Sequence, residues 1–229
     1  MKILHISKKY PNVLGGDAVV VENLYRKQSN AGHEVLILTS NCNDTKVASN
    51  IYKFGFNSTS ADLDVISIKR LASLVLLYFR AHKLISLNRP DIIHTHSVDM
   101  AYVVSSIARR YKIPIVHTFH ILTFNDSNQS ILRRKIELIL LRCVRPKVIT
   151  APNEHDVSAL VRAGMSQAVT VPNGIELDFW KRYPKTKHEI YTYITVGRLE
   201  LQKGLDFLIY ASAILKQSSM ISYSYLTKF

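Results

Sequence analysis

The chain has 229 residues, of which 47% are hydrophobic and 21% are charged, and its formal net charge is +13. This length and apolar content suffice for one globular domain of about 150–200 residues and a short remainder, and the lack of an apolar run of about 20 residues excludes a membrane-spanning helix. The two cysteines lack the spacing of a disulfide framework or a metal site, and the N-terminus lacks the apolar stretch of a signal peptide, so we expect a cytoplasmic protein.

Short apolar runs alternate with helical patterns over the first 175 residues. Helices are expected at residues 17–31, 70–88, 100–111, 130–143 and 153–163. Strands are expected at residues 2–7, 34–40, 91–97, 114–120, 147–152 and 168–172, with one or two more in the irregular region 41–69. Near-continuous apolar strands that alternate with helices are typical of a parallel sheet covered on both faces. The pattern predicts an α/β fold with a Rossmann-like, doubly wound parallel sheet.

A polar, charged segment at 181–189 follows this domain and is expected to be a linker. After it, an apolar run at 190–199 and a helical pattern at 205–216 predict the first βα unit of a second domain. We therefore expect an N-terminal domain at 1–180 and the start of a C-terminal domain at 190–229. A unit of roughly 40 residues buries too little apolar surface to be stable alone, so the second domain is expected to be incomplete.

Gly15, Gly16 and Asp17 join the first strand to the first helix. Glycine permits a tight turn and a close approach of the backbone to a ligand, and a helix N-terminus favours an anion. The segment lacks the G-x-G-x-x-G spacing, and the second strand ends without an acidic residue for a ribose, which argues against a nicotinamide-dependent dehydrogenase. A phosphate site and a turn without a ligand both stay open at this point.

Two neighbouring strands carry four histidines, which are His94, His96, His117 and His120. Alternation places His94 and His96 on one face of their strand, but no carboxylate or cysteine accompanies the histidines at ligand spacing, so we expect no metal site. His94 and His117 are interpreted as buried side chains bonded to the backbone. His120 ends its strand at the carboxyl edge of the sheet, where ligands bind in such folds, and is therefore a candidate active-site residue.

The segment TVGRLELQKG, residues 195–204, closes an apolar run and carries Arg198 and Lys203 with a glycine on either side of the pair. Phosphate oxygens can accept hydrogen bonds from both cations, and each charge-assisted bond contributes about 1.5–3 kcal/mol. The segment therefore predicts a diphosphate site. Surface cations at the start of a helix are the alternative interpretation.

Four motifs in this order resemble glycosyltransferase family 4, a group of retaining enzymes with the GT-B fold. They are Gly15-Gly16 after the first strand, HTFH at 117–120, VPNGIELDFW at 171–180 and TVGRLELQKG at 195–204. The resemblance implies two Rossmann-like domains, of which this chain would contain the N-terminal one and the first βα unit of the other. In this family the N-terminal domain binds the acceptor, and the C-terminal domain binds a nucleotide-diphosphate sugar.

The resemblance also implies roles for individual residues. The positions that match the donor-phosphate contacts are Gly15, Gly16, Arg198 and Lys203. The positions on the acceptor side of the cleft are His96 and Asn173. His120 would contact the transferred sugar and is the candidate catalytic residue. Neither a metal nor a cofactor is expected, because the two cations would stabilise the leaving diphosphate.

One departure from the family is plain, because its Glu-x7-Glu motif has no counterpart here. We expect a retaining glycosyltransferase (EC 2.4 class) that uses a nucleotide-diphosphate sugar as donor. Its acceptor would be a glycan, a lipid or a small molecule. We expect this chain to be a truncated or frame-shifted form with weak or no activity.

The positive charge supports a second hypothesis, a non-catalytic module that binds an acceptor or a membrane surface. Residues 65–90 and 131–147 combine Lys and Arg with apolar residues at helical spacing, as in helices that lie on anionic lipid at the inner membrane surface. The same segments also fit helices that pack on the sheet and keep a solvated basic face. A nucleic-acid partner is not expected, because no recognised binding module accompanies the charge.

Overall fold

The computed structural model describes residues 1–10, 16–41, 49–55, 68–126, 129–181, 195 and 203–217. The chain divides into two compact units, Met1–Ile175 and Glu176–Phe229. Of the expected linker at 181–189 only Lys181 is described, and of the expected strand at 190–199 only Thr195. The predicted domain limits therefore stay predictions.

A single parallel sheet forms the centre of the first unit. Its strands are β1 (Lys2–Lys9), β2 (Glu34–Asn41), β3 (Ile51–Lys53), β4 (Ile92–Thr95), β5 (Ile115–Thr118), β6 (Val148–Ala151) and β7 (Ala168–Thr170). All neighbouring pairs are parallel, and the strand order is β3-β2-β1-β4-β5-β6-β7. The order reverses beside β1, which confirms the predicted doubly wound α/β fold and makes the carboxyl ends of β1 and β4 the expected place for a ligand.

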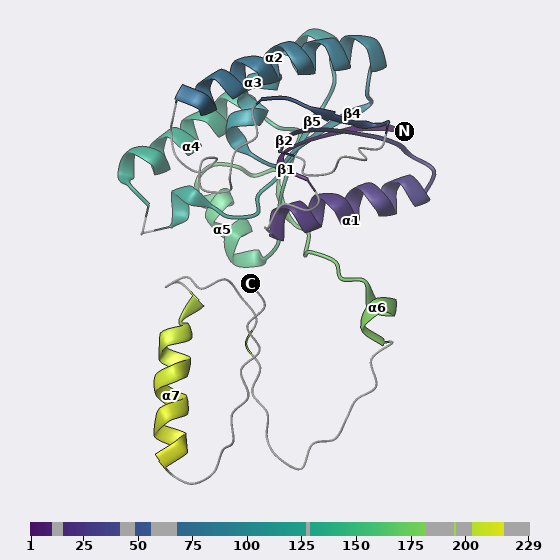
Figure 1. Ribbon diagram of the computed structural model, residues 1–229. Helices are drawn as coiled ribbons and strands as arrows, with labels where there is room; N and C mark the ends of the chain where they lie inside the picture. Colours follow the sequence, from purple (N-terminus) through teal and green to yellow (C-terminus); the bar gives the residue numbers. More distant parts are fainter. Residues whose placement is uncertain are drawn as a thin grey trace. The chain divides into compact units, whose positions relative to one another are not determined.

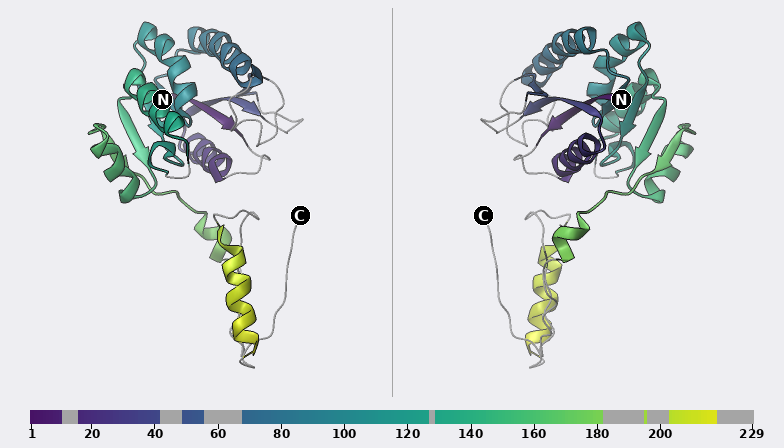
Figure 2. Two further views of the ribbon diagram at one scale, coloured as in Figure 1. Left: turned by 90° about the vertical axis from the view of Figure 1, so that its left-hand side faces the viewer. Right: turned by 90° about the vertical axis from the view of Figure 1, so that its right-hand side faces the viewer.

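Helices cover both faces of this sheet. They are α1 (Gly16–Asn30), α2 (Ile68–Asn88), α3 (Val98–Tyr111), α4 (Ile131–Val144) and α5 (Glu154–Arg162), and a 3-10 turn, η1 (Thr123–Asn125), precedes α4. Figures 1 and 2 show α1 on one face of the sheet and α2 and α3 on the other. This distribution follows from right-handed crossovers that run in opposite directions from β1 and β4.

Successive side chains of β1 point to opposite faces of the sheet, so one face contributes to the hydrophobic core and the other carries His5. Leu4 and Ile6 are fully buried, and they pack with residues of α2 and α3 such as Leu77 and Val104. His5 lies between them in sequence and therefore points to the other face, the side of α1. The histidine face and the main core of the unit are thus separated by the thickness of one sheet.

The ends of several helices agree with the sequence. The side chain of Asn153 accepts a hydrogen bond from the backbone N–H of Asp156, as expected of an N-cap, and Gly164 has a φ of +90° just after α5. The helix expected at 70–88 begins earlier, so Ile68 is helical and does not belong to the strand expected around 63–68.

No helix in the described part of the chain is both long and apolar enough to cross a bilayer.

The second unit contains two described helices, α6 (Leu177–Lys181) and α7 (Leu205–Gln217). The first was not expected from the sequence, and the second agrees with the helix expected at 205–216. Six large apolar side chains of α7 are exposed, namely Phe207, Leu208, Ile209, Tyr210, Ile214 and Leu215. An apolar helix with this exposure gains little stability from packing, as expected for a unit of this size.

Candidate functional site at the carboxyl edge of the sheet

Four histidines gather at the carboxyl ends of the central strands, and we call them the histidine cluster: His5, His94, His96 and His120. His5 on β1 and His94 on β4 are register partners, so their side chains share the α1 face of the sheet. His96 follows β4 and His120 follows β5. The centroids of contacting rings lie 4.4–5.3 Å apart. Residues far apart in sequence thus form one polar site where the strand order reverses.

Hydrogen bonds connect three rings of the cluster to helix α1. The Nε2 atom of His5 lies 2.7 Å from Oε1 of Gln28, and its Nδ1 atom lies 3.0 Å from Nε2 of His96. The Nδ1 atom of His96 lies 3.1 Å from Nε2 of His120. The result is a continuous chain of hydrogen bonds from α1 to His120, two residues after β5.

His94 begins a second row of hydrogen bonds, which crosses the sheet. Its Nε2 atom lies 2.7 Å from the hydroxyl of Thr118, and that hydroxyl lies 2.6 Å from the hydroxyl of Thr150. The expectation of a buried His94 bonded to the backbone is therefore wrong, because the residue is half-buried and its partner is a side chain. Its ring faces the neighbouring strand, where a threonine hydroxyl of β5 reaches it and backbone groups are already paired within the sheet.

His117 lies on the opposite face of the sheet and does not belong to the cluster. It is buried, as expected, and its Nδ1 atom lies 2.8 Å from the hydroxyl of Thr95. Its Nε2 atom has no hydrogen-bond partner among the described residues, and the ring packs edge-on against Phe119. A buried ring in this setting is kept in its neutral form.

Burial lowers the pKa of every ring in the cluster. It brings the pKa of His5 to about 4 and holds the pKa values of His94 and His96 well below the usual 6.5, with the neighbouring histidines adding to the effect. Burial also lowers the pKa of His120, and the negative charge of Asp17 opposes this shift. The rings are therefore neutral at neutral pH, and each has one N–H donor and one acceptor nitrogen.

The cluster also has the composition of a metal site, because ring nitrogens of His5, His94 and His96 lie within 4.8 Å of one another. The three ring planes are, however, within 18–39° of parallel. A metal requires lone pairs that converge on one point at about 2.0–2.1 Å. Near-parallel rings whose nitrogens already pair with each other, with Gln28 and with Thr118 favour a hydrogen-bonded cluster. The expectation of no metal stays a prediction.

The segment after His120 is fixed to helix α4. The backbone N–H of Phe124 donates a hydrogen bond of 2.6 Å to the carboxylate of Glu137, and Nε of Arg134 donates one of 2.8 Å to the carbonyl of Phe124. Burial raises the pKa of Glu137, and the hydrogen bond from Phe124 opposes this shift. These contacts limit the freedom of the chain just beyond His120 and so help to hold its ring in place.

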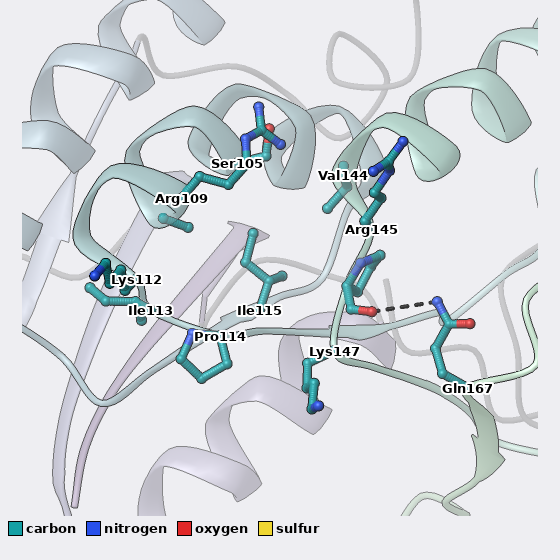
Figure 3. Close-up of a pocket in the computed structure, with 12 residues that line it drawn as sticks. Ser105, Arg109, Lys112, Ile113, Pro114, Ile115, Val144, Arg145, Lys147 and Gln167 are labelled. Atoms are coloured by element: carbon teal, nitrogen blue, oxygen red, sulfur yellow. Dashed lines mark hydrogen bonds between the residues drawn. The ribbon is translucent and has the colours of Figure 1, made fainter.

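A cavity of about 470 Å³ lies at the opposite edge of the sheet, where β5 and β6 begin (Figure 3). Cations from the ends of α3 and α4 line it, namely Arg109, Lys112, Arg145 and Lys147. Cations at the C-terminus of a helix complement its dipole and need no ligand to explain them. Ligands of doubly wound sheets bind at the carboxyl edge, so we place the functional site at the histidine cluster.

Residues 14–179 match the sequence profile named Glycosyltransferase Family 4. The chain belongs to Glycosyltransferase Family 4. The match includes the first helix and the whole histidine cluster except His5, and it extends through the segment that ends at Phe179. This confirms the resemblance found in the sequence and places the chain in a family of glycosyltransferases, which are transferases of class EC 2.4.

Individual relatives agree with the family. The chain is 24% identical over 249 aligned positions to glycogen synthase of Mycobacterium tuberculosis, covering 95% of this chain and 59% of that protein. It is 26% identical over 171 positions to an Escherichia coli UDP-Gal:alpha-D-GlcNAc-diphosphoundecaprenol alpha-1,3-galactosyltransferase, covering 67% of this chain and 43% of the relative. The chain thus spans less than two thirds of the length of these relatives.

Solved glycosyltransferase structures share the fold of this Family 4 chain. Sucrose-phosphate synthase from Thermosynechococcus elongatus superposes with a TM-score of 0.63 at 18% identity, over 77% of this chain and 49% of that one. HepE from Anabaena, solved in complex with UDP-glucose, superposes with a TM-score of 0.54 at 15% identity, over 79% of this chain and 46% of that one. At these identities the likeness shows the fold alone.

The structure brings three of the predicted site residues of this Family 4 chain to one place. His96 and His120 are bonded in the cluster, and Gly16 begins α1 directly before Asp17, whose charge acts on His120. A Cβ atom on Gly16 would meet no atom of the described residues within 4 Å. Gly15 lies outside the described residues.

The other predicted site residues are not joined to the cluster. Asn173 is exposed on the segment after β7, and no hydrogen bond links it to the cluster in the part of the chain that the structure describes. Lys203 belongs to the second unit, where it is exposed two residues before α7. Arg198 lies outside the described residues. The roles assigned to all of these residues stay predictions.

Sequence reasoning missed His5 and Gln28 as members of the site of this Family 4 chain. A signal for His5 was present, because a histidine inside an otherwise apolar first strand must face either the core or a polar site. Gln28 had no signal, because it lies in the last turns of a helix with no motif around it. Only the packing of α1 on β1 brings its amide to the cluster.

Proposed function

We propose that the chain forms the acceptor-side domain and the beginning of the donor-side domain of a retaining glycosyltransferase. The enzyme transfers a sugar from a nucleotide-diphosphate sugar to a glycan, a lipid or a small molecule. The observation that carries the proposal is that His120 is hydrogen-bonded into the histidine cluster at the carboxyl edge of the sheet, where the charge of Asp17 at the start of α1 acts on its ring. The names of the relatives support it, since one gives UDP-Gal as its donor and one structure contains UDP-glucose.

The residues fit this reaction in the following way. The N-terminus of α1, which begins at Gly16, would favour a donor phosphate through its first backbone N–H groups and its dipole. Arg198 and Lys203 would hold the diphosphate and stabilise the charge that develops on it as it leaves. His120 would contact the transferred sugar. Asn173 and His96 would line the acceptor side.

Donor binding through the second unit gives the sharpest test of this proposal. We expect Lys203→Ala to weaken the binding of UDP-glucose by roughly 10- to 100-fold, because a charge-assisted hydrogen bond contributes about 1.5–3 kcal/mol. The measurement is an isothermal titration of the purified 229-residue chain. Lys147→Ala is the matched control, because this lysine lies at the opposite edge of the sheet and should leave the affinity unchanged. Equal affinity of the wild type and Lys203→Ala would contradict the proposed donor site.

Sugar transfer by the 229-residue chain alone is expected to be slow. The alignment with glycogen synthase covers 59% of the length of that protein. The Glu-x7-Glu motif of the family does not occur in the 229 residues of this chain. The chain would lack the donor contacts that residues such as the two glutamates of this motif make, so we expect its affinity for the donor to be reduced. A rapid transfer rate from the purified chain would contradict this expectation.

A second candidate function, binding to a membrane surface, is supported by two helices. Helix α2 exposes Leu71, Val75 and Phe79, four residues apart and therefore on one side, with side-chain exposures of 66%, 53% and 65%. Helix α4 exposes Ile131, Leu132 and Ile139, with Lys135 and Arg142 also exposed. Apolar side chains flanked by cations are suited to the surface of an anionic bilayer. The galactosyltransferase relative is named for a diphosphoundecaprenol substrate, which is a lipid.

Replacing two of these apolar side chains should release the chain from vesicles. We expect Leu71→Ser with Phe79→Ser to reduce co-sedimentation with anionic phospholipid vesicles at least tenfold, because a buried apolar side chain contributes about 1.5–3 kcal/mol. Val161→Ser on α5, whose side chain is also exposed, is the control and should bind as the wild type does. Equal sedimentation of the wild type with neutral and anionic vesicles would reject an electrostatic role for the cations.

A further inference from the structure

The chain of hydrogen bonds from Gln28 to His120 has a direction. The Oε1 atom of Gln28 can only accept, so Nε2 of His5 donates to it. A neutral imidazole with a proton on Nε2 has a lone pair on Nδ1, so His5 accepts from Nε2 of His96. By the same rule, Nδ1 of His96 accepts from Nε2 of His120. One amide oxygen on α1 therefore sets the position of the proton on three rings.

The direction leaves one nitrogen of His120 for another partner. With its proton on Nε2, His120 has a lone pair on Nδ1, and that atom has no hydrogen-bond partner among the described residues. His120 is also less buried than His5. The free lone pair belongs to the ring on which the charge of Asp17, in the first turn of α1, acts.

We propose that Gln28, His5 and His96 are positioning residues that fix the tautomer of His120, so that His120 offers Nδ1 as a hydrogen-bond acceptor to a hydroxyl group of the transferred sugar. This inference rests on the proposed contact between His120 and the sugar. It makes His120 the acceptor and the sugar hydroxyl the donor of that hydrogen bond. It also makes this assignment depend on Gln28 of α1, for which no contact with the sugar or the phosphate is proposed.

The direction has a consequence for specificity. A fixed acceptor bonds a hydroxyl group and does not bond a fluorine atom, because fluorine has no proton to donate. Sites built to bond a hydroxyl reject analogues that lack it, because a polar group of the protein is left unpaired. One position of the sugar should therefore tolerate no replacement of its hydroxyl by fluorine.

Burial of the ring outweighs the one charge that opposes this arrangement. Asp17 from α1 is the charge that acts on His120, and it favours the cationic ring, in which Nδ1 would be a donor. Burial acts more strongly in the opposite direction and keeps the ring neutral. The neighbouring rings of His94, His96 and His5 are neutral as well. Acceptance at Nδ1 is thus the expected state at neutral pH.

Nitrogen NMR of the intact 229-residue chain tests the tautomer directly. With ¹⁵N-labelled histidine, we expect a protonated Nε2 and an unprotonated Nδ1 on His120 in the wild type at neutral pH. In Gln28→Met the oxygen that sets the direction of the hydrogen bonds is lost. The ¹⁵N chemical shifts of Nδ1 and Nε2 of His120 should then move to averaged values, because both tautomers are populated. Gln167→Met removes an amide that bonds Pro146 instead, and it should leave the His120 signals unchanged.

The wild-type spectrum alone can overturn the inference, so it does not depend on how well a variant folds. A proton on Nδ1 of His120, or a cationic ring at neutral pH, would refute the relay. A stoichiometric shift of the His5, His94 and His96 signals on addition of zinc would also refute it, because these nitrogens would then be metal ligands.

Sugar analogues separate the relay from the proposed function. We expect one monofluoro analogue of UDP-glucose to bind the wild type at least tenfold more weakly than UDP-glucose does. In Gln28→Met the ratio of these two affinities should be smaller. Equal binding of all such analogues would refute the contact between His120 and the sugar. The tautomer is measured without any sugar, so a wrong tautomer refutes the relay and leaves the donor site at Lys203 standing.

Discussion

Lowering the pH from 7.5 to 5 should reduce the free energy of unfolding of the first unit by about 4 kcal/mol through His5 and His117 alone. Burial lowers the pKa of His5 to about 4 and that of His117 to about 3, against an ordinary value of 6.5. Between these values the unfolded chain binds a proton that the folded chain does not. Stability is therefore lost as the pH falls below 6.5, and the loss ends below the folded-state pKa.

Other groups modify this loss in a known direction. The pKa values of His94 and His96 are lowered as well, so these rings add to the acid sensitivity. Burial raises the pKa of Glu137 above its ordinary 4.5, so the folded chain binds a proton there more readily than the unfolded chain. Glu137 therefore offsets part of the loss as the pH falls through its raised pKa.

Urea unfolding at several pH values between 7.5 and 5 measures this effect. His117→Asn removes one titrating ring, so the dependence of the unfolding free energy on pH should become shallower by about 1.4 kcal/mol per pH unit below pH 6. His155→Asn, which replaces an exposed histidine at the start of α5, is measured in parallel for comparison. The same slope in wild type and His117→Asn would show that His117 is not held neutral in the folded chain.

Leu4→Ala should reduce the free energy of unfolding by about 2–5 kcal/mol, the range for a fully buried leucine. Leu4 has 0% exposure, and it lies on β1 at the centre of the seven-stranded sheet, in the core formed with α2 and α3. Truncation leaves a cavity between strand and helices that neighbouring side chains fill only in part. The neighbouring His5 points to the opposite face, so the change acts on the core and spares the cluster.

The comparison with an exposed leucine makes this prediction specific. Leu71→Ala on α2 removes the same atoms from a side chain that is 66% exposed, so it should change stability by less than about 0.5 kcal/mol. Both variants are compared with the wild type by urea unfolding at neutral pH. Similar small effects for both would contradict the assignment of Leu4 to the buried face of β1.

Much of the fold could be predicted from local patterns. The apolar runs at β1, β2 and β4 and the helical patterns between them are short-range features, and the cap at Asn153 depends on residues three positions away. The carboxyl ends of parallel strands share one edge, so His120 and Gly16 could be assigned to the same region from strand limits alone. The four motifs then identified the family correctly.

Partners within the site could not be predicted in the same way. The sequence indicated a shared face for His94 and His96, and it suggested backbone partners for His94. The structure pairs His94 with Thr118 and joins His96 to His5, a residue 91 positions away. Such contacts depend on which strands are neighbours and in which register, and many registers satisfy the same alternation of apolar residues.

Local patterns in the sequence were enough to predict the fold class, the positions of most helices and strands, the family and the candidate residues Gly16 and His120. These properties follow from alternation, helical periodicity, turn residues and motifs, all of which act over short stretches of the chain. The pairing of β1 with β4 and the packing of α1 that brings Gln28 next to His5 are visible only in the folded chain. The proton positions in the histidine cluster depend on those two contacts, because a hydrogen-bond direction is set by the atoms that meet across the sheet and its covering helix.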